Sequence, residues 1–244
     1  MILSHLPKFE VPESIADAKK IQNALRAQLK LSDDFANLQT VAGVDVGYDN
    51  IKNLAHASIV VLTFKNLDVL ECVQAFAPTQ FPYVPGFLSF REIPAILAAF
   101  EKLTHWPDLL MIDGQGIAHP RRMGIAAHLG LLLNRPSIGV AKSCLIGKFE
   151  MPGLAKGETK VLMDGNERIG MVLRSRKQVK PLFISPGHRI SIDTAVALVI
   201  QCLTRYRLPE PTRLADKFSK IKNVDSPNKS QNIAMNEASH GTST

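Results

Sequence analysis

The order in which apolar segments follow one another constrains the fold of this chain more than any other feature of its sequence. Three segments rich in β-branched residues come first, separated by short polar connections, at about 40–47, 55–64 and 69–77. Such a series predicts an antiparallel three-strand meander. A strand at 108–112, a helix at 121–133 and a strand at 137–141 follow, an order that favours parallel pairing through a right-handed crossover. The chain is therefore predicted to form an α/β fold with one mixed sheet and flanking helices.

The remaining segments predict further helices and a polar end. Apolar residues recur at helical period over 14–30, where Ser14 and Asp17 have spacing similar to a capping box. Three more helices are predicted at about 90–103, 191–204 and 212–219, and residues 144–185 are predicted to form loops and short strands. After Phe218 the chain is polar and poor in apolar residues. We therefore predict one domain over residues 1–218 and a disordered tail over 219–244.

Composition limits the class of protein. Hydrophobic residues make up 45% of the 244 residues, which is enough for one sizeable core. Lys and Arg exceed Asp and Glu by 29 to 22, and the resulting net charge of +7 suits an anionic partner such as nucleic acid. The three scattered cysteines, predicted to be core thiols in a reducing compartment, are Cys72, Cys144 and Cys202. Because no apolar run reaches the roughly 20 residues of a membrane helix, we expect a cytoplasmic protein, which we predict to be monomeric.

Two carboxylates lie where burial is costly. Asp45 is flanked by valines inside the first strand segment, and Asp113 directly follows the apolar strand segment at 108–112. An isolated ionised carboxylate among apolar residues is unfavourable unless it is paired, hydrogen-bonded or bound to a metal. If the two strands are neighbours, the carboxylates converge and suit Mg²⁺, which prefers hard oxygen ligands. The alternative is that Asp45 pairs with an arginine and that Asp113 caps the glycine turn behind it.

Glu92 has a simpler local interpretation. Ser89 and Glu92 have the spacing of a capping box at the start of a helix, and Pro94 suits a first helical turn. The local pattern therefore favours a structural cap. Glu92 becomes a catalytic candidate only if its carboxylate reaches the site formed by Asp45 and Asp113.

Aromatic residues are concentrated in a proline-containing loop at 81–87. Proline stiffens such a loop and cannot lie in a central strand. A turn whose aromatic rings pack on the core is the favoured interpretation for Phe81 and Phe87. Tyr83 is flanked by prolines, and it suits a rigid wedge that is inserted between unstacked bases.

Basic residues follow the second carboxylate. Arg121 and Arg122 are predicted to open a helix, where positive charge opposes the helix dipole and so favours a bound phosphate; a solvated basic face is the alternative. Lys142 follows a strand and is expected at the same sheet edge as Asp113, either offsetting phosphate charge or facing solvent. His119 on local evidence is a turn histidine. A further basic cluster, predicted to contact a nucleic-acid backbone or else to be a solvated surface, consists of Arg174, Arg176, Lys177, Lys180 and Arg189.

Six longer segments match a known family in the same order along the chain. Spread over about residues 10–218, they read VAGVDVGYD, PYVPGFLSFREIPA, DGQGIAHPRRMGIAAHLGLLL, PSIGVAKSCLIGKF, LFISPGHRIS and YRLPEPTRLAD. Together they resemble the endonuclease V family of deoxyinosine-directed DNA repair nucleases. The resemblance implies a ribonuclease H-like fold and a nucleic-acid partner with a deaminated base. It also implies Mg²⁺-dependent cleavage, with Mn²⁺ as a substitute, at the second phosphodiester bond 3′ to deoxyinosine, leaving 3′-hydroxyl and 5′-phosphate ends.

The resemblance also implies roles for individual residues. Asp45 and Asp113 correspond to metal ligands, and Glu92 becomes a member of the catalytic carboxylate set. Tyr83 corresponds to the wedge that fills the gap left by a flipped base. Further implied catalytic positions are Lys142 near the scissile phosphate, His119 beside the site and Asp216, where the family has an acidic residue or a histidine. The segments that would line the base pocket contain Gly86, Leu88, Gly114, Gly124 and Ile125.

One position departs from the family pattern. Members usually read Asp-Gly-His-Gly, whereas this chain has Gln115. The change bears on the pocket or the rate rather than on the metal ligands. A catalytically silent nucleic-acid-binding module is one alternative, although the complete carboxylate set argues against it. A nuclease directed to inosine RNA or to nucleic-acid structure is another, because the same fold serves ribonucleases and resolvases.

Overall fold

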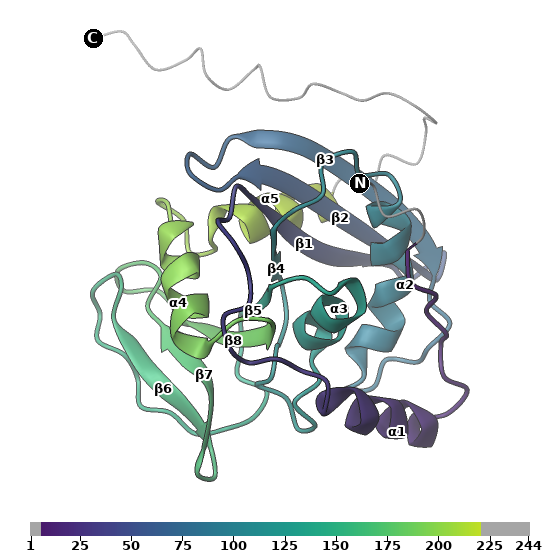
Figure 1. The fold of residues 1–244 in the computed structure, drawn as a ribbon, viewed down its shortest axis with the longest axis horizontal. Coiled ribbons are helices and arrows are strands. Elements are labelled where there is room, and N and C mark those ends of the chain that lie inside the picture. The colour runs from purple at the N-terminus through teal and green to yellow at the C-terminus, as the bar shows by residue number, and fades with distance from the viewer. Residues whose placement is uncertain (1–5, 221–244) are drawn as a thin grey trace, which may run out of the picture.

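A computed structural model of the chain describes residues 6–220, and within this range one mixed sheet has eight strands in the order β3-β2-β1-β4-β5-β8-β7-β6 (Figure 1). The strands are β1 Thr40–Asp49, β2 Leu54–Thr63, β3 Val69–Pro78, β4 Leu109–Ile112, β5 Ser137–Ala141, β6 Thr159–Asp164, β7 Glu167–Leu173 and β8 Leu182–His188. β2 pairs antiparallel with β1 and β3, whereas β4 pairs parallel with β1 and β5. The predicted meander, the parallel crossover and the α/β class are confirmed.

Helices pack on both faces of this sheet. They are α1 Ile15–Arg26, α2 Leu88–Phe100, α3 Ile125–Leu133, α4 Ile192–Gln201 and α5 Glu210–Ser219. On one face α2 and α3 share a core with Ala42 and Val44 of β1, and on the other α4 and α5 share a core with Val41. Because side chains alternate along a strand, the buried residues Val41–Val44 of β1 and all of β4 face a core on each side of the sheet, and Asp45 and Asp113 directly follow these buried stretches. No helix between residues 6 and 220 is long and apolar enough to cross a membrane.

Two predicted helix starts are wrong, and both matter for the site. Helix α2 begins at Leu88, so Ser89 lies inside it, with its hydroxyl 3.0 Å from His128 Nδ1 rather than capping the helix. Pro94 accordingly lies in the helix interior. Helix α3 begins at Ile125, after a turn in which Arg122 has a φ of 56°. The cap of α1 is confirmed by the Ser14 hydroxyl, which accepts a hydrogen bond from a main-chain amide.

The structure changes two details of the sequence interpretation, namely the burial of the cysteines and the end of the last helix. Cys72 lies on the edge strand β3 and is exposed, so its prediction as a core thiol is wrong, whereas Cys202 is buried as predicted. Cys144 is half-buried. At the other end of the chain, Ser219 belongs to α5 and is only 5% exposed. The predicted tail beyond residue 220 lies outside the described residues.

Candidate active site

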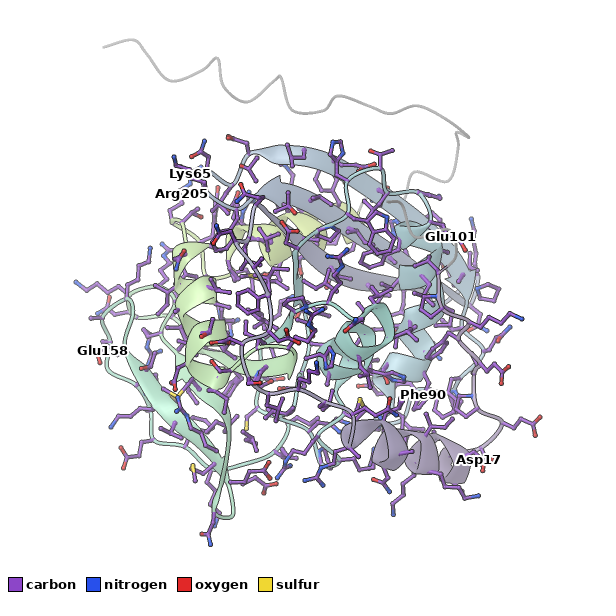
Figure 2. The ribbon with its side chains drawn as sticks, viewed as in Figure 1. Asp17, Lys65, Phe90, Glu101, Glu158 and Arg205 are labelled. Carbon is purple, nitrogen blue, oxygen red and sulfur yellow. The ribbon has the colours of Figure 1, made fainter. Side chains whose placement is uncertain are left out.

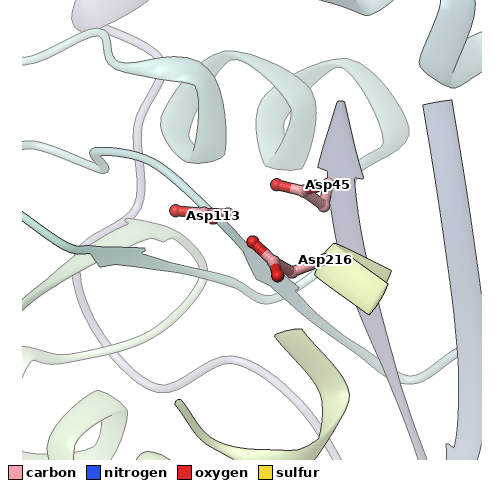
Figure 3. Close-up of side chains that lie close together, drawn as sticks. All are labelled: Asp45, Asp113 and Asp216. Atoms are coloured by element: carbon pink, nitrogen blue, oxygen red, sulfur yellow. The ribbon is translucent and has the colours of Figure 1, made fainter. Parts of the chain in front are cut away.

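Three aspartates converge where the pairing between β1 and β4 ends. Asp45 lies in the middle of β1 and directly follows Val44, the residue that pairs with the last residue of β4, and Asp113 directly follows β4. Asp216 comes from α5. Each residue offers one carboxylate oxygen, and these three atoms lie within 4.8 Å of one another. Figure 3 shows the side chains turned toward the same space between β1, the end of β4 and α5.

Two glycines let α5 approach β1 closely enough to form this group. Gly43 and Gly47 lie two residues on either side of Asp45, and strand alternation places all three on one face. A Cβ on Gly43 would lie 1.9 Å from the carbonyl oxygen of Pro211, and one on Gly47 would lie 3.0 Å from that of Ser219. Any larger residue at Gly43 therefore collides with the helix backbone.

Ser219 links the end of α5 to the first aspartate. Its hydroxyl donates a hydrogen bond to Asp45 Oδ2 at 2.5 Å. The carbonyl groups at the helix end accept from the sheet, since Gln74 Nε2 donates to Phe218 at 2.6 Å and His56 Nδ1 lies 3.1 Å from the Ser219 oxygen. The sequence analysis missed Ser219; the alternation of Gly43, Asp45 and Gly47 was the available sign that another element packs here.

Lys142 lies among these carboxylates, at the sheet edge where it is expected. Its ammonium donates to Asp216 Oδ1 at 2.7 Å and forms an ion pair with Asp113. Burial opposes the charge of Lys142, but the two aspartates outweigh it and raise the pKa of the lysine. Arg207 donates to the Lys142 carbonyl oxygen at 3.0 Å, which holds the backbone at this position.

The aspartates titrate differently because their surroundings differ. Burial raises the pKa of Asp113 to about 6; the charge of Lys142 counteracts this effect, and that of Asp45 adds to it. Partial burial also disfavours the charged form of Asp216, but its hydrogen bonds from Lys142 and Lys220 prevail and lower its pKa. Asp216 is therefore the more readily ionised of these two carboxylates.

Glu92 is a buried carboxyl group rather than a helix cap. It is 6% exposed, and its carboxylate accepts a hydrogen bond from the Tyr48 hydroxyl at 2.8 Å. Burial raises the pKa of Glu92 to about 8; the Tyr48 hydrogen bond lowers it, whereas the negative charges of Asp45 and Asp113 raise it further. The local capping pattern is thus overridden, because α2 starts earlier and turns Glu92 toward the aspartates.

The donor set fits a divalent cation. Asp45, Asp113 and Asp216 supply three hard oxygen ligands, the type that Mg²⁺ and Mn²⁺ prefer. Like-charged carboxylates this close to one another disfavour joint ionisation, a cost that a bound cation offsets. Between residues 6 and 220, the three aspartates are the group placed to hold a metal, and Glu92 lies outside that group.

The predicted base-pocket residues fall on two segments. Gly86 lies in the loop before α2, and Leu88 is the first residue of that helix. In the second segment, Gly114 lies shortly after β4, Gly124 is the N-cap of α3, and Ile125 is its first residue. The second group is tightly packed: a Cβ on Gly114 would lie 2.6 Å from Ile125 Cγ2, and one on Gly124 would lie 2.3 Å from the Gln115 carbonyl oxygen. At Gly124 the close atoms belong to the backbone, so this position requires glycine.

His119 faces Gly86. Its Nδ1 accepts from the amides of Arg121 at 3.1 Å and Met123 at 3.3 Å, so its Nε2 carries the proton and donates to the Gly86 oxygen at 2.9 Å. Burial lowers the pKa of His119 to about 4, and the neighbouring arginines contribute, although the Gly86 hydrogen bond opposes this shift. The imidazole is therefore neutral near pH 7. Its hydrogen bonds connect the Gly86 carbonyl group to the amides of Arg121 and Met123.

The two arginines of this turn are paired within the chain. Arg121 donates to the Gly86 oxygen at 2.7 Å, and its guanidinium lies 4.1 Å from the centre of the Phe87 ring. Arg122 is 8% exposed and forms ion pairs with Asp164 at 2.8 Å and Glu167 at 2.7 Å. The expectation that these arginines open a helix is wrong, because α3 begins at Ile125, whereas their contacts to phosphate stay a prediction.

The second basic cluster is also partly internal. Arg174 is 6% exposed and donates to the carbonyl oxygens of Gly153 and Pro152. Arg189 pairs with Asp34 at 3.2 Å. Arg174 and Arg189 therefore stabilise loops. The other members of the cluster are exposed, namely Arg176, Lys177 and Lys180, and the neighbouring Val179 is half-buried.

The proline-containing loop separates buried from exposed rings as predicted. Phe81 and Phe87 are 3% and 7% exposed and pack with Phe90, which is labelled in Figure 2, and with Ala18 of α1. Tyr83 is 71% exposed. The loop thus exposes the ring of Tyr83, while the rings of Phe81 and Phe87 are packed in the core.

Gln115, where the family pattern has histidine, contacts the segment that follows β5. Its Nε2 donates to the Ser143 carbonyl oxygen at 2.9 Å. Its Oε1 is buried and has no hydrogen-bond partner within residues 6–220. Gln115 therefore ties the turn after Asp113 to the segment after Lys142.

Comparisons with known proteins agree with this geometry. The family model described as Endonuclease V matches residues 23–217. An endonuclease V from Rippkaea orientalis is 54% identical over 214 residues, covering 88% of this chain and 93% of the relative. The crystal structure of endonuclease V from Streptomyces avermitilis superposes with a TM-score of 0.81 at 41% identity, covering 86% of this chain and 92% of that one.

A third relative was solved with nucleic acid. The endonuclease V of Ciona intestinalis, in complex with a 24mer DNA containing an inosine followed by a ribo-adenosine, superposes with a TM-score of 0.73 at 32% identity. The match covers 85% of this chain and 97% of that one. With the family model spanning most of its length and relatives above half identity, this chain belongs to the endonuclease V family.

Proposed function

We propose that this protein is a Mg²⁺-dependent DNA repair endonuclease that nicks the strand at the second phosphodiester bond 3′ to deoxyinosine, leaving 3′-hydroxyl and 5′-phosphate ends. The observation that carries the proposal is the convergence of Asp45, Asp113 and Asp216 in a member of this family. The inosine-containing DNA bound by the Ciona intestinalis relative supports the choice of substrate.

At the scissile phosphate, the three aspartates would bind the metal and Lys142 would neutralise negative charge. Asp45, Asp113 and Asp216 would hold the ion, and Mg²⁺, when bound, supplies a Lewis acid that activates water and stabilises the leaving 3′-oxygen. Glu92 completes the acidic set and is oriented by Tyr48. The Lys142 ammonium, already beside two of the aspartates, offsets negative charge on the phosphate.

Base recognition is separate from this chemistry. Hypoxanthine pairs weakly, so extruding it from the duplex costs less than extruding a normally paired base. The exposed Tyr83 ring would fill the gap, supported by the buried Phe81 and Phe87 beneath its loop. The backbone groups around Gly86 and Gly114 would read the edge of the extruded base.

Inosine RNA is a second candidate substrate. A ribonucleotide follows the inosine in the strand bound by the Ciona intestinalis relative, which favours a site that accepts a 2′-hydroxyl at that position. Discrimination between DNA and RNA requires contacts to that group. The cleavage rates of matched inosine-containing DNA and RNA strands show which substrate is preferred.

One assay tests the proposal. The full chain is incubated with Mg²⁺, Mn²⁺ or EDTA and with matched DNA and RNA strands that contain inosine or adenosine at one position. We expect one nick per inosine strand with either metal, and none with EDTA. Equal cutting of unmodified strands would identify a structure-directed nuclease, and binding without cutting a silent binding module; either result contradicts the proposal. We further infer that the protein is a cytoplasmic monomer. Light scattering of the purified chain measures its mass and so tests the monomeric state.

A further inference from the structure

Helix α1 contributes no residue to the site described above, yet one of its side chains is tied to it. Gln22 is fully buried. Its Nε2 donates one hydrogen bond to the Gly86 oxygen at 3.1 Å and one to the Met123 oxygen at 3.2 Å, and its Oε1 accepts from Arg121 Nε at 2.5 Å. A buried amide is costly unless its groups are paired. The Gln22 side chain is therefore held in one orientation by three partners from two other segments.

The Gly86 oxygen is the centre of this network. It accepts from Gln22, from His119 Nε2 at 2.9 Å and from Arg121 Nη2 at 2.7 Å. Gly86 itself has a φ of 82°, in the region that favours glycine. Three convergent donors on one carbonyl group fix the orientation of this peptide far more narrowly than a loop outside regular structure normally allows.

The two carbonyl groups bound by Gln22 belong to the two segments that contain the predicted pocket residues. Gly86 belongs to the loop that carries Tyr83, and Met123 directly precedes Gly124. Apolar contacts reinforce the same junction, because Ala18 of α1 packs with the Phe81 and Phe87 rings. A single amide from α1 thus spans both segments.

We propose that Gln22 is a positioning residue for base recognition: it holds the Tyr83 loop and the turn before α3 at a fixed separation, and so sets the width of the pocket for hypoxanthine. The inference rests on the proposed function and adds α1 to the parts of the chain that determine specificity. His119 and Arg121 act with Gln22 as the remaining donors to Gly86.

Two substitutions and one control test this role. Gln22→Met keeps the length of the side chain and removes its hydrogen bonds, whereas Gln22→Glu retains an acceptor for Arg121 but turns a carboxylate toward two carbonyl oxygens. Asn23→Ala removes an exposed amide from the same helix and is the matched control. For each full-length protein we would measure KM and kcat on inosine DNA, the Mn²⁺ affinity, and hydrogen exchange of peptides covering residues 81–91 and 119–124.

We expect both Gln22 variants to raise KM for the inosine strand about tenfold, which corresponds to about 1.4 kcal/mol. We expect kcat at saturating substrate and the Mn²⁺ affinity to stay within about twofold, since the aspartates belong to other elements. Exchange in both peptides should accelerate, whereas Asn23→Ala should match the unaltered protein throughout.

Unchanged KM and unchanged exchange in both variants would overturn the proposal. A parallel loss of kcat, Mn²⁺ affinity and thermal stability would also overturn it, because that pattern marks general destabilisation. The exchange measurement needs no substrate. If the unaltered protein fails to prefer inosine, the proposed function fails by itself, and the exchange data still decide whether Gln22 holds the two segments.

Discussion

Replacing Gly43 with alanine tests whether the close approach of α5 to β1 forms the acidic site. The added Cβ would lie 1.9 Å from the Pro211 oxygen, whereas ordinary contact begins at 3.4 Å, so the start of α5 must withdraw by about 1.5 Å. The three colliding atoms of α5, from Pro211 and Thr212, all belong to its backbone and cannot rotate away. Overpacking of this kind costs about 2–3 kcal/mol, which lowers Tm by about 4–12 °C in a chain of this size.

The same shift should weaken metal binding, because α5 carries both Asp216 and the Ser219 hydroxyl that contacts Asp45. We expect the Mn²⁺ affinity, measured by titration calorimetry, to fall by about tenfold or more, as for the loss of a supporting contact at a metal site. Gly153→Ala is the matched control, since its Cβ would meet only the flexible Glu158 side chain. If Gly43→Ala matched that control in both Tm and Mn²⁺ affinity, the steric argument would be refuted.

Three further predictions concern other parts of the molecule. Asp45→Asn should abolish nicking of inosine DNA while strand binding stays measurable, because it removes a charged ligand and not the basic surface; undiminished cleavage in a gel assay would exclude a metal role. Tyr83→Ala should weaken binding to inosine DNA by about 1–3 kcal/mol, the value of one stacking contact, and equal affinities by fluorescence anisotropy would rule out the wedge. Burial lowers the pKa of His128 to about 4, below its unfolded value of about 6.5, so its contribution to stability is present above pH 6.5 and is lost as pH falls toward 4. His128→Gln should therefore reduce the acid-induced drop in the free energy of unfolding by up to about 3 kcal/mol, as urea titrations at pH 7 and pH 4.5 would show; identical pH dependence in the two proteins would contradict this assignment.

Residue patterns over short stretches were sufficient for most of the sheet. Runs of β-branched residues predicted β1, β2 and β3 to within two residues at each end, and the alternation of strand and helix predicted the parallel pairing of β4 with β5. The meeting of Asp45 and Asp113 was expected only if their strands are neighbours, and β4 does pair with β1.

Local patterns were misleading where a distant partner competed with them. Ser89 and Glu92 have capping-box spacing, yet Glu92 is bound by Tyr48 from β1 and Ser89 contacts His128 from α3. Arg122 was predicted to open a helix, but it lies in the turn before α3, where acidic residues of the β6–β7 hairpin pair with it. In each case a contact with a residue distant in the sequence replaces the local arrangement that the pattern predicted.

The sequence by itself determined which residues are chemically costly to bury and which segments form strands, because those properties depend on residue type and on spacing over a few positions. Only the tertiary structure decided which of these residues meet. Asp45 and Ser219 are 174 positions apart, and Gln22 reaches carbonyl groups 64 and 101 positions away. Contacts at such separations depend on how whole helices pack on the sheet, and the shape of that packing is a property of all the side chains together rather than of any one motif.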